Sequence, residues 1–271
     1  MSHIKHIVLF DMDDTLSDFK TGIIPESAYR SIELLKQRGD TLVGMASGRG
    51  HFFFNEQRKD IKVDAFVCVN GQCTTVNNEI VYESYVTDED LKRLIDVLEP
   101  MQGGLFAVNS FYGIKPILTV THPDMEYSHS VTRLKDYGSN YSDEHKNHLL
   151  QAAFKPEYDA YFEKEFPHLS FHRYYDFMVD IYPKNTSKLT GIKALAELHN
   201  LTLDDVIAFG DGLNDLEMIQ GVKHGIAMGN AHPDVKDVAY MITDSVNDHG
   251  IYNALTKLGL IKEKYEIDCE F

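Results

Sequence analysis

Two carboxylates stand one residue apart at the end of an apolar run. Asp11 and Asp13 follow residues 7–10 (IVLF), which have the pattern of a buried strand. Such a strand presents both carboxylates beyond the edge of its sheet, and residues two apart on a strand project to the same side. Two like charges crowded there are costly unless a cation or a shared proton relieves them. This pair therefore predicts chemistry rather than support of the fold.

A second acidic strand end follows residues 206–209. The sequence GDGLND, residues 210–215, places Asp211 and Asp215 directly after that apolar run. In open parallel sheets, ligands bind beyond the carboxyl ends of the strands, so both acidic segments are expected at one site. Hard oxygen ligands without His or Cys favour Mg²⁺, which binds through few carboxylates together with substrate phosphate.

A magnesium ion at this point would give the carboxylates of Asp11 and Asp13 different roles. One aspartate kept ionised beside the metal is a potential nucleophile that forms an aspartyl-phosphate. The other can protonate the leaving oxygen and later accept a proton from water. Different environments could separate the pKa values of the two groups in this way.

Further residues could stabilise the charge on a transferring phosphoryl group. Ser47 and Gly48 follow a second predicted strand and open a predicted helix, whose N-terminal N–H groups form a natural anion site. Lys188, near the start of another predicted helix, supplies a cation that could bridge nucleophile and phosphate. Asn214 could donate to the same group. Each feature is weak by itself, but all of them fall at the end of a strand or the start of a helix.

The elements that must position these residues alternate between strand and helix. Strands are predicted over residues 4–10, 41–46 and 65–69, and helices over 25–38 and 50–60. Pro25 suits the first turn of its helix and Gly39 its C-terminal end. From residue 186 the alternation returns, with a helix over 187–199 and a strand over 206–209. This order favours a parallel sheet with helices on its faces, an α/β class of fold.

The middle of the chain changes character. A hairpin around residues 77–78 and a helix opened by a capping box at Thr87 precede aromatic, strand-like runs at 105–112, 117–121, 169–174 and 177–182. We expect an inserted α+β domain over residues 84–183, and a core formed by residues 1–83 and 184–271. In the insert, Arg173, Tyr174 and Tyr175 are candidates to contact a substrate.

Composition restricts the partners of this chain of 271 residues. The formal net charge is −16, from 42 acidic and 26 basic residues, which disfavours nucleic acid or an anionic membrane as a partner. The three cysteines have no metal-binding or CxxC spacing, and the N-terminus has no signal-peptide pattern. No apolar run approaches the roughly 20 residues of a membrane span. We therefore expect a soluble, cytoplasmic protein; its oligomeric state stays open.

These motifs, in this order, resemble those of the haloacid dehalogenase (HAD) superfamily. The likeness rests on the DxD segment at 11–15, Ser47, Lys188 and the segment at 210–215, and it covers almost all of the core. The position of the insert, Asn70-Gly71 before it and Gly229-Asn230-Ala231 near the end are similar to the Cof-type branch with a class IIB cap. The resemblance implies a doubly wound, Rossmann-like core with an inserted α+β cap.

The resemblance also implies roles for the site residues. Asp11 would be the phosphorylated nucleophile and Asp13 the general acid and base. The Mg²⁺ ligands would be the Asp11 carboxylate, the Asp13 backbone carbonyl and Asp211. The residues that hold phosphate would be Met12 through its backbone, Ser47, Gly48, Lys188 and Asn214. Asp215 would contact these residues and not the phosphate. Many Cof-type members have Gly where this chain has Asp14, and the residues alone suggest no role for that carboxylate.

The expected function is that of a Mg²⁺-dependent phosphatase for small phosphorylated metabolites, such as sugar phosphates or a phosphorylated cofactor. A phosphotransferase or mutase, in which an alcohol replaces water as acceptor, would need the same residues. A non-enzymatic phospho-aspartate receiver is disfavoured because receiver domains are shorter and have no inserted cap. A sugar-binding protein that has lost catalysis is disfavoured because Asp11, Asp13, Lys188 and Asp211 are all present.

Overall fold

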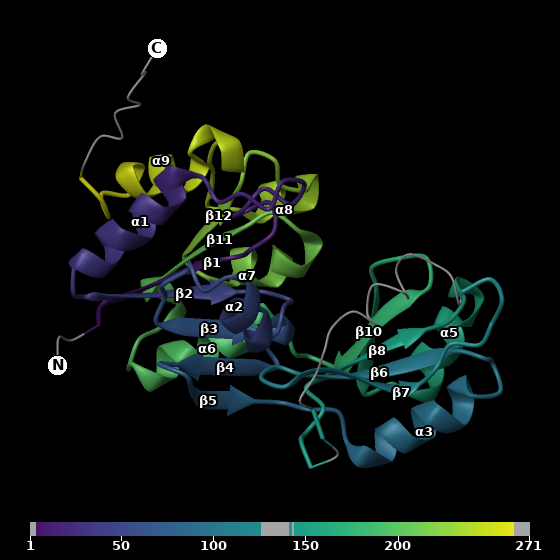
Figure 1. Ribbon diagram of the computed structural model, residues 1–271. Helices are drawn as coiled ribbons and strands as arrows, with labels where there is room; N and C mark the ends of the chain where they lie inside the picture. The colour runs from purple at the N-terminus through teal and green to yellow at the C-terminus, as the bar shows by residue number, and fades with distance from the viewer. Residues whose placement is uncertain (1–3, 126–140, 143, 263–271) are drawn as a thin grey trace. The chain divides into compact units, whose positions relative to one another are not determined.

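The computed structural model describes residues 4–125, 141–142 and 144–262 (Figure 1). Cys269 lies outside the described residues. The chain divides into two compact units. The first consists of Met1–Gly48, Lys59–Tyr82 and Ser187–Phe271, and the second of Arg49–Arg58 and Glu83–Thr186.

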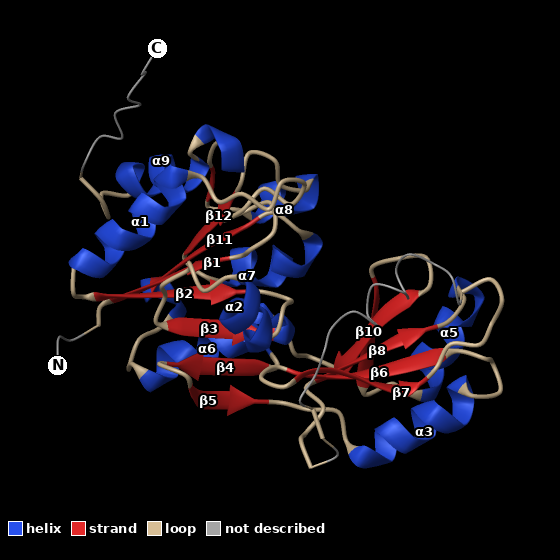
Figure 2. Cartoon of the chain, in the orientation of Figure 1, coloured by secondary structure: helices blue, strands red, loops and turns tan. Residues whose placement is uncertain are grey.

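The first unit is built on one eight-stranded sheet, coloured red in Figure 2. Its spatial order is β13-β12-β11-β1-β2-β3-β4-β5, and every pair from β13 to β3 is parallel. The strands are β1 His6–Phe10, β2 Thr41–Ala46, β3 Ala65–Cys68, β4 Cys73–Val76, β5 Glu79–Glu83, β11 Val206–Gly210, β12 His224–Ala227 and β13 Met241–Ile242.

Strand β1 lies in the middle of this sheet because its apolar residues are buried on both faces. Its last four residues are fully buried, as parallel strands covered on both sides require. Phe10 is in register with Met45 of β2 on one side and with Phe209 of β11 on the other. The carboxyl ends of β2, β1 and β11 therefore lie next to one another, and the residues that follow them share one edge of the sheet.

Helices pack on this sheet in two groups. Helix α1 (Glu26–Gln37) packs against α9 (Gly250–Lys257), and α6 (Lys188–Leu198) packs on β3 and β4 beside α7 (Leu216–Gly221). Helix α8 (Pro233–Val238) packs on α7. Helix α1 begins one residue later than predicted, with Pro25 as its N-cap rather than in its first turn, and it ends before Gly39, which has a φ of 71°. The doubly wound α/β prediction for this part of the chain is confirmed.

The second unit is a five-stranded antiparallel sheet of order β7-β6-β8-β10-β9. Helices α3 (Asp88–Leu98) and α5 (Asp159–Glu165) supply the apolar residues that pack on one face of it. Helix α2 (His51–Gln57) belongs to this unit, since Ser110 receives its first backbone N–H groups. The strands are β6 Gly104–Asn109, β7 Gly113–Leu118, β8 Leu149–Ala153, β9 Leu169–Arg173 and β10 Met178–Pro183.

Several local predictions were wrong, among them the strands over 105–112 and 117–121, because β6 ends at Asn109 and β7 at Leu118. Strand β8 was missed because LLQAA has neither alternation nor β-branched residues, yet it pairs with both β6 and β10 and lies inside its sheet. The predicted strand over 65–69 ends one residue early, at Cys68. Val69 instead begins a turn, η1 (Val69–Gly71), with a φ of 53°. A positive φ at a β-branched residue costs on the order of 1–3 kcal/mol, so the surroundings must impose it.

Candidate active site

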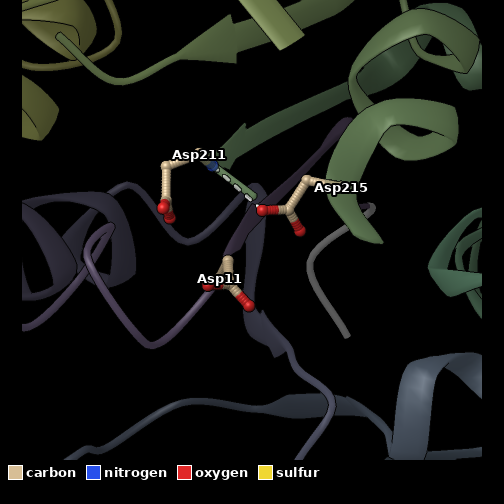
Figure 3. A group of neighbouring side chains, drawn as sticks. All are labelled: Asp11, Asp211 and Asp215. Atoms are coloured by element: carbon tan, nitrogen blue, oxygen red, sulfur yellow. Dashed lines mark hydrogen bonds between the residues drawn. The ribbon is translucent and has the colours of Figure 1, made fainter. Parts of the chain in front are cut away.

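The ends of β1 and β11 bring together acidic residues 200 positions apart in the sequence. The backbone N–H of Asp11 donates to the carbonyl of Phe209 over 3.0 Å, which continues the parallel pairing one residue past β1. The carboxylates of Asp11, Asp211 and Asp215 consequently have oxygens within 4.8 Å of one another (Figure 3). Gly210 permits this arrangement, because a methyl group there would lie 2.6 Å from the Asp215 carboxyl carbon.

Lys188 crosses this cluster from the start of α6. Its ammonium donates to Asp11 Oδ1 over 2.5 Å and to Asp215 Oδ1 over 2.6 Å, and its side chain is 0% exposed. A fully buried lysine needs such partners, since an unpaired buried charge is strongly disfavoured. Lys188 begins α6 at a capping box formed by Ser187 and Thr190. The first turn of one helix therefore reaches the end of the central strand.

The electrostatic balance of the cluster leaves an excess of negative charge. Burial raises the pKa of Asp11 well above its usual value; Lys188 offsets part of this effect, and Asp215 and Asp211 add to it. Burial also raises the pKa of Asp211 to about 7. Burial alone would lower the pKa of Lys188, but Asp11 and Asp215 hold it above its ordinary value, so the ammonium stays charged. Three carboxylates thus share one ammonium.

This arrangement fits a hard divalent cation. The donors are carboxylate oxygens, without His or Cys, and the raised pKa values of Asp11 and Asp211 show that one more positive charge would stabilise both ionised groups. Asp215 already uses both of its oxygens. One accepts from Lys188, and the other accepts from the backbone N–H groups of Asp211 over 2.9 Å and Gly212 over 3.0 Å.

Thr15 is a site residue that the sequence analysis did not single out. Its hydroxyl donates to Asp211 Oδ1 over 2.6 Å, and its side chain is buried. This bond orients the Asp211 carboxylate, and it leaves the other carboxylate oxygen for a ligand. The position of Thr15 four residues after Asp11 was the available signal, but a threonine in an acidic segment has no distinctive pattern of its own.

Asp13 and Asp14 leave the strand in a tight turn. Asp13 is partly exposed and pairs with Ser17 in an isolated backbone β-bridge, while Asp14 has a φ of 59°. Asp14 Oδ1 accepts the backbone N–H of Phe19 over 2.9 Å, and its carbonyl accepts Asn230 Nδ2 over 2.7 Å. A left-handed φ suits glycine, and aspartate is among the few other residues that tolerate it. Asp14 therefore has a local role: its side chain stabilises the turn that carries Asp13.

The candidate phosphate-binding residues lie on three segments. Met12 is buried directly after Asp11, and Ser47 is buried after β2. Ser47 and Asn214 are joined through one residue, because the carbonyl of Ser47 accepts the backbone N–H of Asn70 over 3.1 Å and Asn214 Nδ2 donates to Asn70 Oδ1 over 3.2 Å. The structure therefore brings the Ser47–Gly48 segment and Asn214 to one residue of the first unit. Lys188 contacts Asp11 and Asp215 directly, and Asp215 contacts Asp211.

The three candidates named in the second unit have different surroundings. Arg173 is held by both carboxylate oxygens of Asp159 and by the carbonyls of Phe154 and Asp176. The hydroxyl of Tyr174 accepts Gln151 Nε2 over 3.1 Å, whereas Tyr175 is exposed. The contact of any of them with a substrate stays a prediction.

Comparisons with known proteins show the family of this chain. The family model of the haloacid dehalogenase-like hydrolases matches residues 8–255. The chain belongs to this family. A Bacillus subtilis (strain 168) protein named "Putative phosphatase YkrA" is 31% identical over 261 residues, which cover 94% of this chain and 98% of that protein. The predicted family and the phosphatase type of hydrolase are confirmed.

Solved structures of other proteins share the fold. The crystal structure of a hypothetical protein from Geobacillus kaustophilus HTA426 has a TM-score of 0.84 and 31% identity, and covers 95% of this chain and 100% of its own. A sugar phosphatase of HAD subclass IIB has a TM-score of 0.78 and 23% identity, with 94% of this chain and 100% of its own covered. Within the described residues, no helix is both long and apolar enough to cross a membrane.

Proposed function

We propose that this HAD phosphatase hydrolyses phosphate monoesters of small metabolites through an aspartyl-phosphate on Asp11. The observation that carries the proposal is the ion pair between the buried Asp11 and the fully buried Lys188, 2.5 Å apart at the end of the central strand. The ammonium stabilises the ionised form of Asp11 and offsets part of the burial that raises its pKa, and a bound Mg²⁺ would stabilise that form further. An ionised, positioned carboxylate is the form that can attack phosphorus.

In the first step, a carboxylate oxygen of Asp11 bonds to phosphorus as the ester oxygen leaves. Asp13 gives its proton to that oxygen, so the product alcohol departs neutral. Asp13 is partly exposed and lies two residues after Asp11. This position supports the role, because a proton donor must reach both substrate and water. In the second step, Asp13 takes a proton from water, whose oxygen attacks phosphorus. Inorganic phosphate leaves, and the Asp11 carboxylate is restored.

Mg²⁺ would be held by the carboxylates of Asp11 and Asp211 and by the backbone carbonyl of Asp13. Bound there, the ion would neutralise charge on the phosphoryl oxygens as they pass through the transition state. Asp215 remains a support, since Lys188 and two backbone N–H groups occupy its oxygens. The phosphate itself would be held by Lys188, Asn214, Ser47, Gly48 and the Met12 backbone.

The proposed substrates are small phosphorylated compounds, with sugar phosphates first among them. A net charge of −16 opposes polyanionic partners such as nucleic acid, so binding of phosphate must rely on the local cations of the site. The subclass IIB protein of similar fold is a sugar phosphatase, and this chain contains a second unit that could recognise the alcohol part of a substrate. We assign the catalytic role to the first unit, the cap role to the second, and the reaction to the cytoplasm.

A panel of phosphorylated metabolites tests the proposal. Released inorganic phosphate is measured with Mg²⁺ and with EDTA, for the wild type and for Asp11→Asn, which keeps the size of the side chain but removes the nucleophile. We expect hydrolysis by the wild type in Mg²⁺ only, and no turnover by Asp11→Asn. Asp204→Asn, an exposed carboxylate of the same unit, serves as the matched control. Undiminished turnover by Asp11→Asn would overturn the mechanism, and full activity in EDTA would remove the metal from it.

A further inference from the structure

The turn η1 has a backbone that its own residues do not favour. Val69, Asn70 and Gly71 all have positive φ, of 53°, 53° and 91°. Asn and Gly tolerate this region, but a β-branched valine does not, and Val69 is 1% exposed. Strain that persists in a buried turn indicates that contacts on several sides hold it, and such turns gather at functional sites.

One side of the turn is bound to the segment after β2. The backbone N–H of Asn70 donates to the carbonyl of Ser47, while the N–H of Ser47 donates to Val67 in β3 over 2.8 Å. The Asn70 amide also fills the space beside Gly48, since a methyl group on Gly48 would lie 3.2 Å from Asn70 Oδ1. The Asn70 backbone therefore holds the Ser47 carbonyl, and the Asn70 side chain lies against Gly48.

A second side of the turn orients Asn214. Asn214 Nδ2 donates one hydrogen to Asn70 Oδ1 over 3.2 Å, and an amide NH₂ carries two hydrogens, so the second remains for a ligand. Asn214 is exposed, whereas Asn70 is 9% exposed. The buried residue thus fixes the amide of the exposed one.

The third side of the turn abuts the helix that carries Lys188. A methyl group on Gly71 would lie 2.0 Å from the carbonyl oxygen of Ser187, so the turn and the start of α6 are in direct backbone contact. Three segments that the proposed mechanism assigns to phosphate binding therefore meet at η1. They contribute the Ser47–Gly48 backbone, Asn214 and Lys188.

We propose that Asn70 is a positioning residue for the phosphoryl group. Its side chain orients the Asn214 amide toward the phosphate and sets the spacing between Asn214 and the Ser47–Gly48 backbone. This inference rests on the proposed function, because it assumes that these residues hold a phosphoryl group. Asn70 itself makes no contact with the reacting atoms in this scheme.

The substitution Asn70→Gly tests the inference, since glycine keeps the left-handed backbone and removes only the amide. We expect the KM for a phosphate ester, and the inhibition constant of inorganic phosphate, to rise about tenfold, with kcat changed less than about twofold. Asn77→Gly is the matched control, because Asn77 also has a positive φ, of 51°, in the β4–β5 turn of the same unit. A purely conformational role of Asn70 predicts no change in either constant.

A double-mutant cycle shows whether Asn70 acts through Asn214. If it does, Asn70→Gly in the background of Asn214→Ala adds less than about a twofold effect, because the bond is already lost. Effects that multiply would overturn this coupling, and unchanged constants in Asn70→Gly would overturn the proposal. In both cases a loss of turnover in Asp11→Asn would leave the proposed function standing.

A second variant keeps the test decisive if Asn70→Gly does not fold. Asn70→Asp retains the size, the tolerance of positive φ and an acceptor for Asn214, but adds a negative charge. Beside a bound phosphoryl group, this charge is expected to raise the inhibition constant of inorganic phosphate by more than about tenfold, with an effect that weakens in high salt. An inhibition constant equal to that of the wild type would place Asn70 away from the phosphate and overturn the proposal.

Discussion

Each of the two sheets of this molecule shields one aspartate from water: Asp11 is buried, and Asp180 is half-buried. In the first unit, the parallel sheet ends in a cluster where Asp11 meets the buried ammonium of Lys188. In the second, Asp180 of the antiparallel sheet meets the neutral amide of Gln151, whose Nε2 donates to it over 3.0 Å. Burial raises the pKa of both carboxyl groups, that of Asp180 to about 7, and Lys188 and Gln151 each offset only part of this effect. The difference lies in the partners: an ammonium, and a metal ion bound beside it, can stabilise an ionised Asp11 more strongly than an amide can stabilise an ionised Asp180.

The topology of each sheet explains which partners are available. Parallel strands place the ends of segments that are remote in the sequence at one edge, so β1, β11 and α6 deliver Asp11, Asp211 and Lys188 to one point. The antiparallel sheet pairs residues across a ladder, and Asp180 lies opposite Gln151 on one side and His172 on the other. In such a sheet, the nearest partner of a side chain is the residue opposite it on the neighbouring strand. Gln151, opposite Asp180, makes the described hydrogen bond to it.

The largest effect is expected from removing the cation of the first unit. Lys188→Met leaves Asp11 and Asp215 without their shared partner, and should lower kcat/KM by about 10³-fold and the free energy of unfolding by about 3 kcal/mol. Steady-state kinetics and denaturant unfolding measure the two changes. Lys193→Met, at an exposed position of the same helix, should change neither. Activity near the wild-type level in Lys188→Met would break the contrast between the two aspartates.

A smaller effect is expected from removing the Thr15 hydroxyl, which donates a hydrogen bond to Asp211. Thr15→Val removes the 2.6 Å bond to Asp211 Oδ1 with little change in volume. The half-saturating Mg²⁺ concentration should rise about tenfold, as for other residues that orient a metal ligand, while kcat at saturating metal changes little. Thr15→Ser keeps the hydroxyl and should restore most of the metal affinity. Equal metal requirements in all three proteins would show that the bond does not orient Asp211.

The smallest effect concerns Asp180 and depends on pH. Because its folded pKa of about 7 lies above that of the unfolded chain, the unfolded state loses the proton first, and the folded state is destabilised progressively between about pH 4 and pH 7. Asp180→Asn should therefore stabilise the protein by about 1–2 kcal/mol at pH 8 and by little at pH 4. Thermal unfolding at both pH values measures this difference. Asp176→Asn, exposed in the same unit, should show none, and a pH-independent gain in Asp180→Asn would contradict the contrast.

The core of the site could be predicted because each of its motifs depends on local sequence. An apolar run followed by a polar residue marks the end of a buried strand, and parallel sheets bring such ends together; this placed Asp11 and Asp211 in one cluster before the structure did. Strand β8 could not be predicted in the same way. Its residues acquire strand geometry from pairing with β6 and β10, and no local pattern records those partners.

The sequence by itself determined the order of the strands and helices in the core, the acidic strand ends and the family. The elements depend on apolar periodicity and on residue types, which can be read from neighbours along the chain, and the family follows from the resemblance of the motifs to those of a known superfamily. Only the tertiary structure decided that Lys188 joins Asp11 to Asp215, that Thr15 holds Asp211, and that Asn70 links Ser47 to Asn214. Each of these contacts joins segments whose approach depends on strand register and helix packing, and a polar residue carries no local mark of the partner it will meet.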